Sequence, residues 1–209
     1  MKVLTIPAFR AVLKKYPAGH IYQGFGENYD LYMHAVGIPG HNGIDIAMAE
    51  GTPILASAGI IVEVKRDEMG YGRHIRQHTK PDANGDFFEL TFGHLKDIFV
   101  PVGFAVPDAY TIGTMGNTGF IVSGSTPYWG NAPAGRGVHL HFGIRECSTK
   151  PTLWQVQYTS GLKTYLKNYD VAKGAVDPLP YIMDSTPKNV LIFAIKRAIE
   201  DMWKIISNL

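Results

Sequence analysis

The segment Val138-His139-Leu140-His141-Phe142 carries two histidines on either side of one leucine. Residues two apart in a strand point to the same face, so His139 and His141 would present their imidazoles side by side while Leu140 turns toward a core. Two such imidazoles can both ligate a metal, or one can ligate it while the other carries a proton. The segment therefore predicts a core strand that also carries part of a functional site.

A second segment, Gly40-His41-Asn42-Gly43-Ile44-Asp45, supplies a further histidine and a carboxylate. In a fully extended strand His41 and Asp45 would lie about 13 Å apart, which is too far to hold one ion at about 2 Å from each. A helix would bring them together, but the glycines of the segment oppose a helix. We therefore expect a turn through Asn42-Gly43 that leads into a strand and folds His41 back toward Asp45. Together with the first segment, this gives two histidines and one carboxylate, the ligand types that zinc prefers in open catalytic sites.

Three other histidines fall on expected strands. His94 ends one of them, where a lone histidine is more often a hydrogen-bonded structural residue than a catalyst. His74 and His78 alternate with Arg76 on one strand face, and we expect them to form a partly solvated polar surface.

Short runs of β-branched and aromatic residues, separated by glycine turns, dominate the chain up to about residue 150. Strands are expected at 44–47, 58–64, 73–79, 87–95, 100–106 and 110–115. Asn84-Gly85 lies between two alternating runs and predicts a hairpin. Helical periodicity is almost absent here, so the sequence predicts a mainly β protein with an antiparallel sandwich or open barrel.

The character of the sequence changes after residue 150. Residues 151–171 are expected to be loop with some helix, and the proline-rich stretch 177–181 to be an extended exit. Thr186 suits the N-cap of a helix and Pro187 its first position, and the amphipathic pattern continues from Val190 to Leu209. We expect this C-terminal helix to pack on its own domain, with docking on a partner or a membrane surface as the alternative.

Composition describes an ordinary globular protein of 209 residues, 45% hydrophobic and 18% charged. The formal net charge is +2 and the basic residues are scattered, so no nucleic-acid surface is expected. Cys147 is the only cysteine, which excludes an internal disulfide and a cysteine-based zinc site. No signal peptide or membrane span is recognisable, so we expect a soluble protein. The expected division is an N-terminal segment at 1–22, a domain at 23–180 and the C-terminal helix region at 181–209.

The order of these motifs resembles the lysostaphin-type (LytM) zinc metallopeptidases, which cleave peptide cross-links of bacterial peptidoglycan. The matching blocks are Gly40 to Ala47, Gly51-Thr52-Pro53, Gly70-Tyr71-Gly72, Gly93-His94-Leu95, Gly116-Asn117-Thr118-Gly119 and His139-Leu140-His141-Phe142. The resemblance covers the chain from about Gln23 to Arg145. It implies the antiparallel β fold of that family and peptidoglycan stem peptides or cross-bridges as the substrate.

The resemblance also implies a role for each site residue. His41, Asp45 and His141 would hold one zinc ion per chain, and His94 and His139 would stand at the two catalytic positions. His139 is the expected base because it neighbours His141 on the strand, while His94 would stabilise the oxyanion or protonate the leaving amine. The opposite split of roles between the two histidines stays open.

Two stretches are longer than the family pattern: the loop between Gly119 and Val138, and the hairpin at 80–89. Both are expected to shape the substrate groove and hence specificity, with a surface decoration as the alternative. Two other functions stay open. One is a non-catalytic protein that binds the wall or activates a hydrolase, although all five site positions are filled. The other is a component of a lysis or cell-puncturing apparatus, docked through the helix from Val190 to Leu209, that reaches the wall after release or within a virion.

Overall fold

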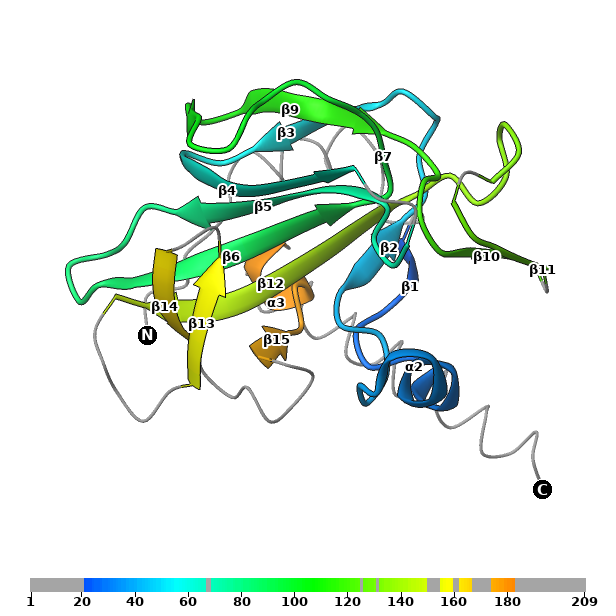
Figure 1. Cartoon of the computed structure of the whole chain (residues 1–209), viewed down its shortest axis with the longest axis horizontal. Helices are drawn as coiled ribbons and strands as arrows, with labels where there is room; N and C mark the ends of the chain where they lie inside the picture. The colour runs from blue at the N-terminus through cyan, green and yellow to red at the C-terminus, as the bar shows by residue number, and fades with distance from the viewer. Residues whose placement is uncertain are drawn as a thin grey trace, which may run out of the picture.

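A computed structural model describes residues 21–66, 69–124, 126–130, 132–149, 155–159, 162–166 and 174–182 of the chain. Strands dominate it, as the cartoon in Figure 1 shows. They are β1 (Ile21–Gln23), β2 (Ile44–Ile46), β3 (Pro53–Ala56), β4 (Gly59–Arg66), β5 (Arg73–Thr79), β6 (Asp86–Gly93), β7 (Leu95–Ile98), β8 (Ala105–Val106), β9 (Tyr110–Met115), β10 (Ile121–Ser123), β11 (Thr126–Tyr128), β12 (Leu140–Ser148), β13 (Gln155–Thr159), β14 (Leu162–Leu166) and β15 (Ala175–Val176). The described helices are α2 (Tyr29–Val36) and α3 (Leu179–Ile182), and neither has the length and apolar character needed to span a bilayer.

The strands form one large and two small sheets. The large sheet has the order β1-β2-β12-β6-β5-β4-β8, while β14 and β15 also pair with β12, and β13 pairs with β14. The small sheets are β3-β9-β7 and the hairpin β10-β11. The described strand pairs are antiparallel, so the prediction of a mainly antiparallel β fold with open sheets is confirmed.

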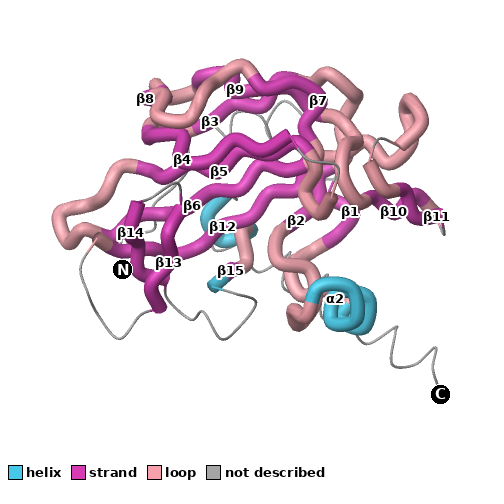
Figure 2. Tube along the Cα trace, viewed as in Figure 1, coloured by secondary structure: helices cyan, strands magenta, loops and turns pink. Residues whose placement is uncertain are grey.

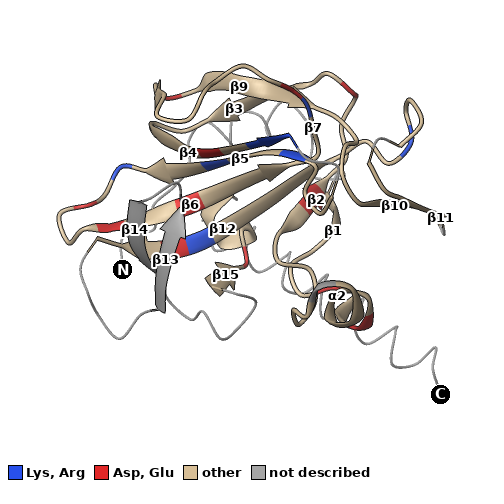
Figure 3. Ribbon diagram, viewed as in Figure 1, with Lys and Arg blue, Asp and Glu red and all other residues tan. Residues whose placement is uncertain are grey.

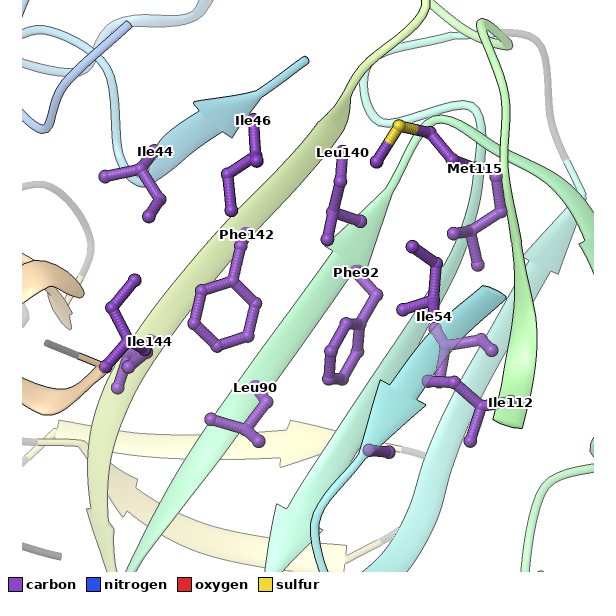
Figure 4. Packing of buried hydrophobic residues seen from close by; sticks show 14 of the residues in the cluster. Ile44, Ile46, Ile54, Leu90, Phe92, Ile112, Met115, Leu140, Phe142 and Ile144 are labelled. Atoms are coloured by element: carbon purple, nitrogen blue, oxygen red, sulfur yellow. The ribbon is translucent and has the colours of Figure 1, made fainter. Parts of the chain in front are cut away.

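One hydrophobic core lies between the large sheet and the sheet β3-β9-β7. Phe92 on β6 and Phe142 on β12 are fully buried with ring centroids 5.4 Å apart. Figure 4 shows Ile54 and Ile112 from the smaller sheet on the same side as these rings. Each such side chain contributes about 1.5–3 kcal/mol through burial.

This core fixes which face of β12 carries the functional side chains. Leu140, Phe142 and Ile144 are all buried in the core cluster. Strand alternation therefore directs His141 and Arg145 to the opposite face of the sheet. A slip of one residue in the pairing of β12 would move the whole apolar set out of the core, so packing specifies the register that builds the site.

Several local predictions were wrong. Where 151–171 was expected to be loop with some helix, its described residues 155–159 and 162–166 form the hairpin β13-β14, and β14 extends the large sheet at Cys147 and Ser148. The stretch 177–181 contributes to α3, where Asp177 Oδ1 accepts a hydrogen bond from the Leu179 amide. Of the strand expected at 100–106, only β8 forms.

The helix α2 was not predicted at all. It ends at Gly37, whose φ of 67° supplies the left-handed cap. Residues 1–20 and the helix expected from Val190 to Leu209 lie outside the described residues. The division of the chain at 22 and 180 therefore stays a prediction.

Candidate active site

Three predicted ligands come together where β2 pairs with β12. Asp45 lies opposite His141 in that antiparallel pair. His41 precedes β2 on a bend, and its Nε2 lies 3.2 Å from Asp45 Oδ1 and 2.9 Å from His141 Nδ1. His141 Nδ1 also lies 3.2 Å from Asp45 Oδ1. The backbone therefore folds His41 back toward Asp45, as the sequence predicts.

Gly40 makes this return possible. Its φ is 87°, in the left-handed region that glycine adopts without steric cost. A Cβ on Gly40 would lie 2.3 Å from the carbonyl oxygen of Gly26. The backbone carbonyl of His41 accepts a hydrogen bond from the Gly26 amide at 2.7 Å, which anchors the bend to the segment before α2.

The three ligand atoms fit a small divalent cation. One atom from each of His41, Asp45 and His141 can be chosen so that all lie within 4.8 Å of one another, and the three residues are buried. Ligands about 2.0–2.2 Å from a tetrahedral ion lie roughly 3.3 Å apart, close to the distances between these atoms. His41 Nδ1 lies 3.2 Å from the carbonyl oxygen of Gly24, an acceptor that places the ring proton on Nδ1 and leaves Nε2 unprotonated.

The electrostatics of the cluster favour the protonation states in which Asp45 and His141 can bind a metal. Burial alone would raise the pKa of Asp45, but His139, His141 and His41 outweigh it and hold that pKa well below its ordinary value. Burial lowers the pKa of His141 to about 4, which keeps its imidazole neutral. A carboxylate and neutral imidazoles are the forms that bind a metal.

His94 and His139 form a second pair beside this cluster, with ring centroids 4.4 Å apart. His94 Nδ1 lies 2.7 Å from the carbonyl oxygen of Thr118, and His139 Nδ1 lies 2.7 Å from that of Gly137. A carbonyl can only accept, so in both rings the Nδ1 proton is fixed and Nε2 carries the lone pair. His139 Nε2 lies 3.6 Å from Asp45 Oδ2.

His94 occupies an unusual backbone position between β6 and β7. Its φ is 61°, which is uncommon for a residue other than glycine. Burial, followed by the nearby His139, lowers the pKa of His94 well below its ordinary value. Left-handed residues of this kind cluster at functional sites, where the surrounding structure enforces them. His94 is thus more than the structural residue that its position in the sequence alone would favour.

Two tyrosines complete the surroundings of the ligands and were not predicted as site residues. The ring of Tyr71 lies 4.7 Å from that of His141, and its hydroxyl accepts a 2.6 Å hydrogen bond from Asn42 Nδ2. The ring of Tyr22 lies 5.6 Å from that of His139, and desolvation together with the nearby Asp45 carboxylate raises the pKa of Tyr22. In the sequence, the glycines that flank Tyr71 could have marked it as a site residue, whereas no pattern marks Tyr22.

A cleft of about 710 Å³ opens over the site. His94, His139, His141 and Asp45 line it, together with residues of α2 and β1. Phe120, Ile121, Val122 and Gly124 also line it, so the long loop after Gly119 lies where the sequence placed it, next to the cleft. Figure 2 shows the hairpin β10-β11 that this loop forms. The hairpin at 80–89 contributes no lining residue to this cleft, so its role in shaping the groove stays a prediction.

His74 and His78 are not partly solvated, as had been expected, but buried. His74 Nε2 lies 3.2 Å from Glu63 Oε1, and His78 Nε2 lies 3.1 Å from Glu89 Oε2. Figure 3 shows basic and acidic segments side by side across β4, β5, β6 and β12. The partners come from neighbouring strands, so only the strand register reveals them.

Comparisons with known proteins agree with this geometry. The sequence model of peptidase family M23 matches residues 39–152. The catalytic domain of lysostaphin from Staphylococcus simulans has a similar structure, with a TM-score of 0.50 and 23% identity over 83% of this chain and 96% of that chain. LytU is similar with a TM-score of 0.50 and 25% identity over 79% of this chain and 86% of that chain. No curated protein sequence gives a significant match. Because the family model spans more than half of the sequence, this chain belongs to peptidase family M23.

Proposed function

We propose that the chain is a zinc-dependent endopeptidase that hydrolyses peptide cross-links of bacterial peptidoglycan. The observation that carries the proposal is the convergence of His41, Asp45 and His141 beside two histidines whose Nε2 atoms carry no proton. Asp45, His141, His94 and His139 all line one cleft. Membership of a peptidase family supports hydrolysis of a peptide bond. The three converging residues are the proposed zinc ligands.

The protein's own groups have distinct tasks in this mechanism. When bound, zinc supplies a Lewis acid that polarises the scissile carbonyl and lowers the pKa of an attacking water. His139 accepts the proton of that water at Nε2, and the Asp45 carboxylate 3.6 Å away stabilises the resulting imidazolium. The Gly137 carbonyl keeps the ring in this orientation through Nδ1.

His94 has a separate task beside His139. Its ring lies next to that of His139, and its Nδ1–H is committed to the Thr118 carbonyl. Nε2 therefore accepts a hydrogen bond from the water or the leaving amine and orients it. This role replaces the expected one of stabilising the oxyanion or protonating the amine, which would need a proton on Nε2. After the first transfer, His139 holds a proton that it returns to the amine as the bond breaks.

The test combines metal content with hydrolysis of cross-linked peptidoglycan. Wild type is expected to bind about one zinc and to cleave, His141→Ala to lose both, and His94→Ala to keep zinc and lose rate by about 10²–10⁴-fold. The exposed His34, which contacts only the Asp30 carbonyl within the described structure, provides the control His34→Ala with wild-type behaviour. Zinc binding without cleavage of any wall preparation would replace the enzyme with a wall-binding module. A protein that binds no zinc would overturn the metal site.

A further inference from the structure

The floor of the cleft continues beyond the metal ligands along three adjacent strands. On β12, Gly143 and Arg145 follow His141 on the same face and pair with Thr91 and Glu89 of β6. On the other side of β6, Arg76 of β5 pairs with Thr91. Each step of two residues advances about 6.6 Å, so Arg76 and Arg145 lie in rows roughly 7 and 13 Å past the row of His141. Both arginines line the same cleft as the ligands.

Buried carboxylates hold the two guanidinium groups in place. Glu89 is 0% exposed, and its Oε1 lies 2.8 Å from Arg145 Nη1 and 3.8 Å from Arg76 Nη1. Arg76 Nε lies 3.3 Å from Glu63 Oε1. His78 occupies the other oxygen of Glu89 at 3.1 Å. The arginine side chains are only 19% and 13% exposed, so they differ from mobile surface arginines.

This arrangement leaves hydrogen-bond donors available. A guanidinium has five N–H donors. Within the described part of the chain, Arg145 makes one side-chain hydrogen bond, to Glu89, and Arg76 makes none besides its ion-pair contacts. Arg76 Nε is buried against Glu63, so the donors that can face the cleft are those on the Nη atoms. Donors that face the cleft bond water in the free protein and can exchange that water for an acceptor of a ligand.

The ligand that suits two fixed guanidinium groups is a carboxylate. Its two oxygens match the fork of a guanidinium, and the resulting charge-assisted bonds are about twice as strong as neutral ones. Arg76 and Arg145 are balanced by Glu63 and Glu89, so the pair has no excess positive charge. Recognition therefore depends on directed hydrogen bonds rather than on long-range attraction.

We propose that Arg76 and Arg145 form a subsite for a free carboxylate of the substrate, about two to four residues from the bond that is cut. The subsite rests on the proposed function and refines its substrate. Peptidoglycan stem peptides carry free carboxylates, whereas a bridge built only of glycine carries none within it. The enzyme therefore selects carboxylate-bearing stem-peptide cross-links over neutral glycine bridges.

The direct test compares two synthetic cross-linked stem-peptide dimers, one with free α-carboxylates and one with carboxamides at the same positions. With the zinc-loaded full chain, kcat/KM for the carboxamide dimer is expected to be at least about tenfold lower. Equal values for the two dimers would overturn the subsite and leave the proposed function intact. If neither dimer is cut, while zinc is bound, the proposed function fails and the subsite with it.

Variants of Arg76 and Arg145 test whether these residues cause the preference for the carboxylate dimer. Arg145→Gln and Arg76→Gln are expected to bring the ratio of kcat/KM between the carboxylate and carboxamide dimers close to one. Arg145→Lys keeps the charge without the fork and is expected to restore only part of the preference. The exposed Arg66, at the end of β4, gives the control Arg66→Gln, which should retain the full preference. Retention of the preference in both cleft variants would overturn the assignment.

A binding measurement separates recognition from catalysis and needs no variant that might fold poorly. Calorimetry on the metal-free full chain is expected to show at least about tenfold tighter binding of the carboxylate dimer than of the carboxamide dimer. Equal affinities in the metal-free chain would overturn the proposal.

Discussion

His41 Nε2 lies 2.9 Å from His141 Nδ1, although the residues are 100 positions apart in the chain and both are buried. Asp45 Oδ1 lies 3.2 Å from each of these nitrogens. Lone pairs on three atoms this close repel one another unless a proton or a cation lies among them. The pairing of β2 with β12 enforces the approach, so the fold holds these three atoms together in an arrangement that a metal ion could occupy in place of a proton.

The first prediction is that zinc stabilises the folded chain. At a zinc concentration about 100 times Kd, the free energy of unfolding should rise by about 2.7 kcal/mol, which corresponds to roughly 5–10 °C in Tm. Asp45→Asn removes the ligand charge and should abolish most of the shift, whereas His34→Ala should keep it. Differential scanning calorimetry of metal-free protein with and without zinc measures all three. A full shift in Asp45→Asn would contradict the ligand assignment.

The second prediction concerns two glycines near His141: Gly43, directly before β2, and Gly143, two residues after His141 on β12. A Cβ on Gly43 would lie 2.6 Å from the Phe142 carbonyl oxygen and 2.7 Å from His141 Cε1, whereas one on Gly143 would lie 3.4 Å from its nearest neighbour. Gly43→Ala should cost about 1–3 kcal/mol of stability and weaken zinc binding. Gly143→Ala is the matched control, and urea unfolding with zinc titration should leave it near wild type. Equal losses would show that the clash does not position the ring.

Much of the fold could be predicted because its strands alternate strictly between core and opposite face. β5 at Arg73–Thr79 and β9 at Tyr110–Met115 form over the predicted residues. The same alternation placed His139 and His141 on one side of the chain. Residue spacing also excluded an extended path between His41 and Asp45, so the turn that joins them could be predicted from the sequence.

The other features of the fold and the site could not be predicted, because they depend on contacts between segments that lie far apart in the sequence. Helix α2 has exposed apolar side chains at Tyr29, Leu31 and Met33 and lacks a side-chain N-cap, so neither an amphipathic stripe nor a capping signal marks it. His74 and His78 looked like surface residues because their acidic partners lie on other strands. Which strands become neighbours is a property of the whole sheet, and the buried ion-pair network follows from that.

The third prediction uses the pH dependence of stability. Burial alone would raise the pKa of Glu89, but His78, Arg145 and Arg76 outweigh it and lower the pKa from 4.5 to about 2. Because the folded pKa is depressed, the stabilisation is complete above pH 4.5 and is lost as the pH falls through about 2. The shift corresponds to roughly 3 kcal/mol.

Urea unfolding at about pH 5, 4, 3 and 2.5 is expected to show the stability advantage of wild type over Glu89→Gln shrinking steadily toward acid. The exposed Asp108→Asn variant is the control and should follow wild type at every pH. A constant difference between wild type and Glu89→Gln across this range would refute the role of the ionised carboxylate.

The last prediction concerns the loop beside the cleft. Trp129 is 60% exposed, and its ring lies 4.1 Å from that of Phe120, which lines the cleft. Aromatic pairs contribute about 0.5–1.5 kcal/mol, so Trp129→Ala should let Phe120 move and raise KM by about two- to tenfold with little change in kcat. Phe99→Ala, at an equally exposed aromatic outside the lining of the cleft, should leave KM unchanged. Steady-state kinetics on the two stem-peptide dimers distinguishes these outcomes. An unaltered KM in Trp129→Ala would mean that the loop covers the site without contributing to substrate selection, since the only aromatic support of Phe120 within the described structure would have been removed without effect.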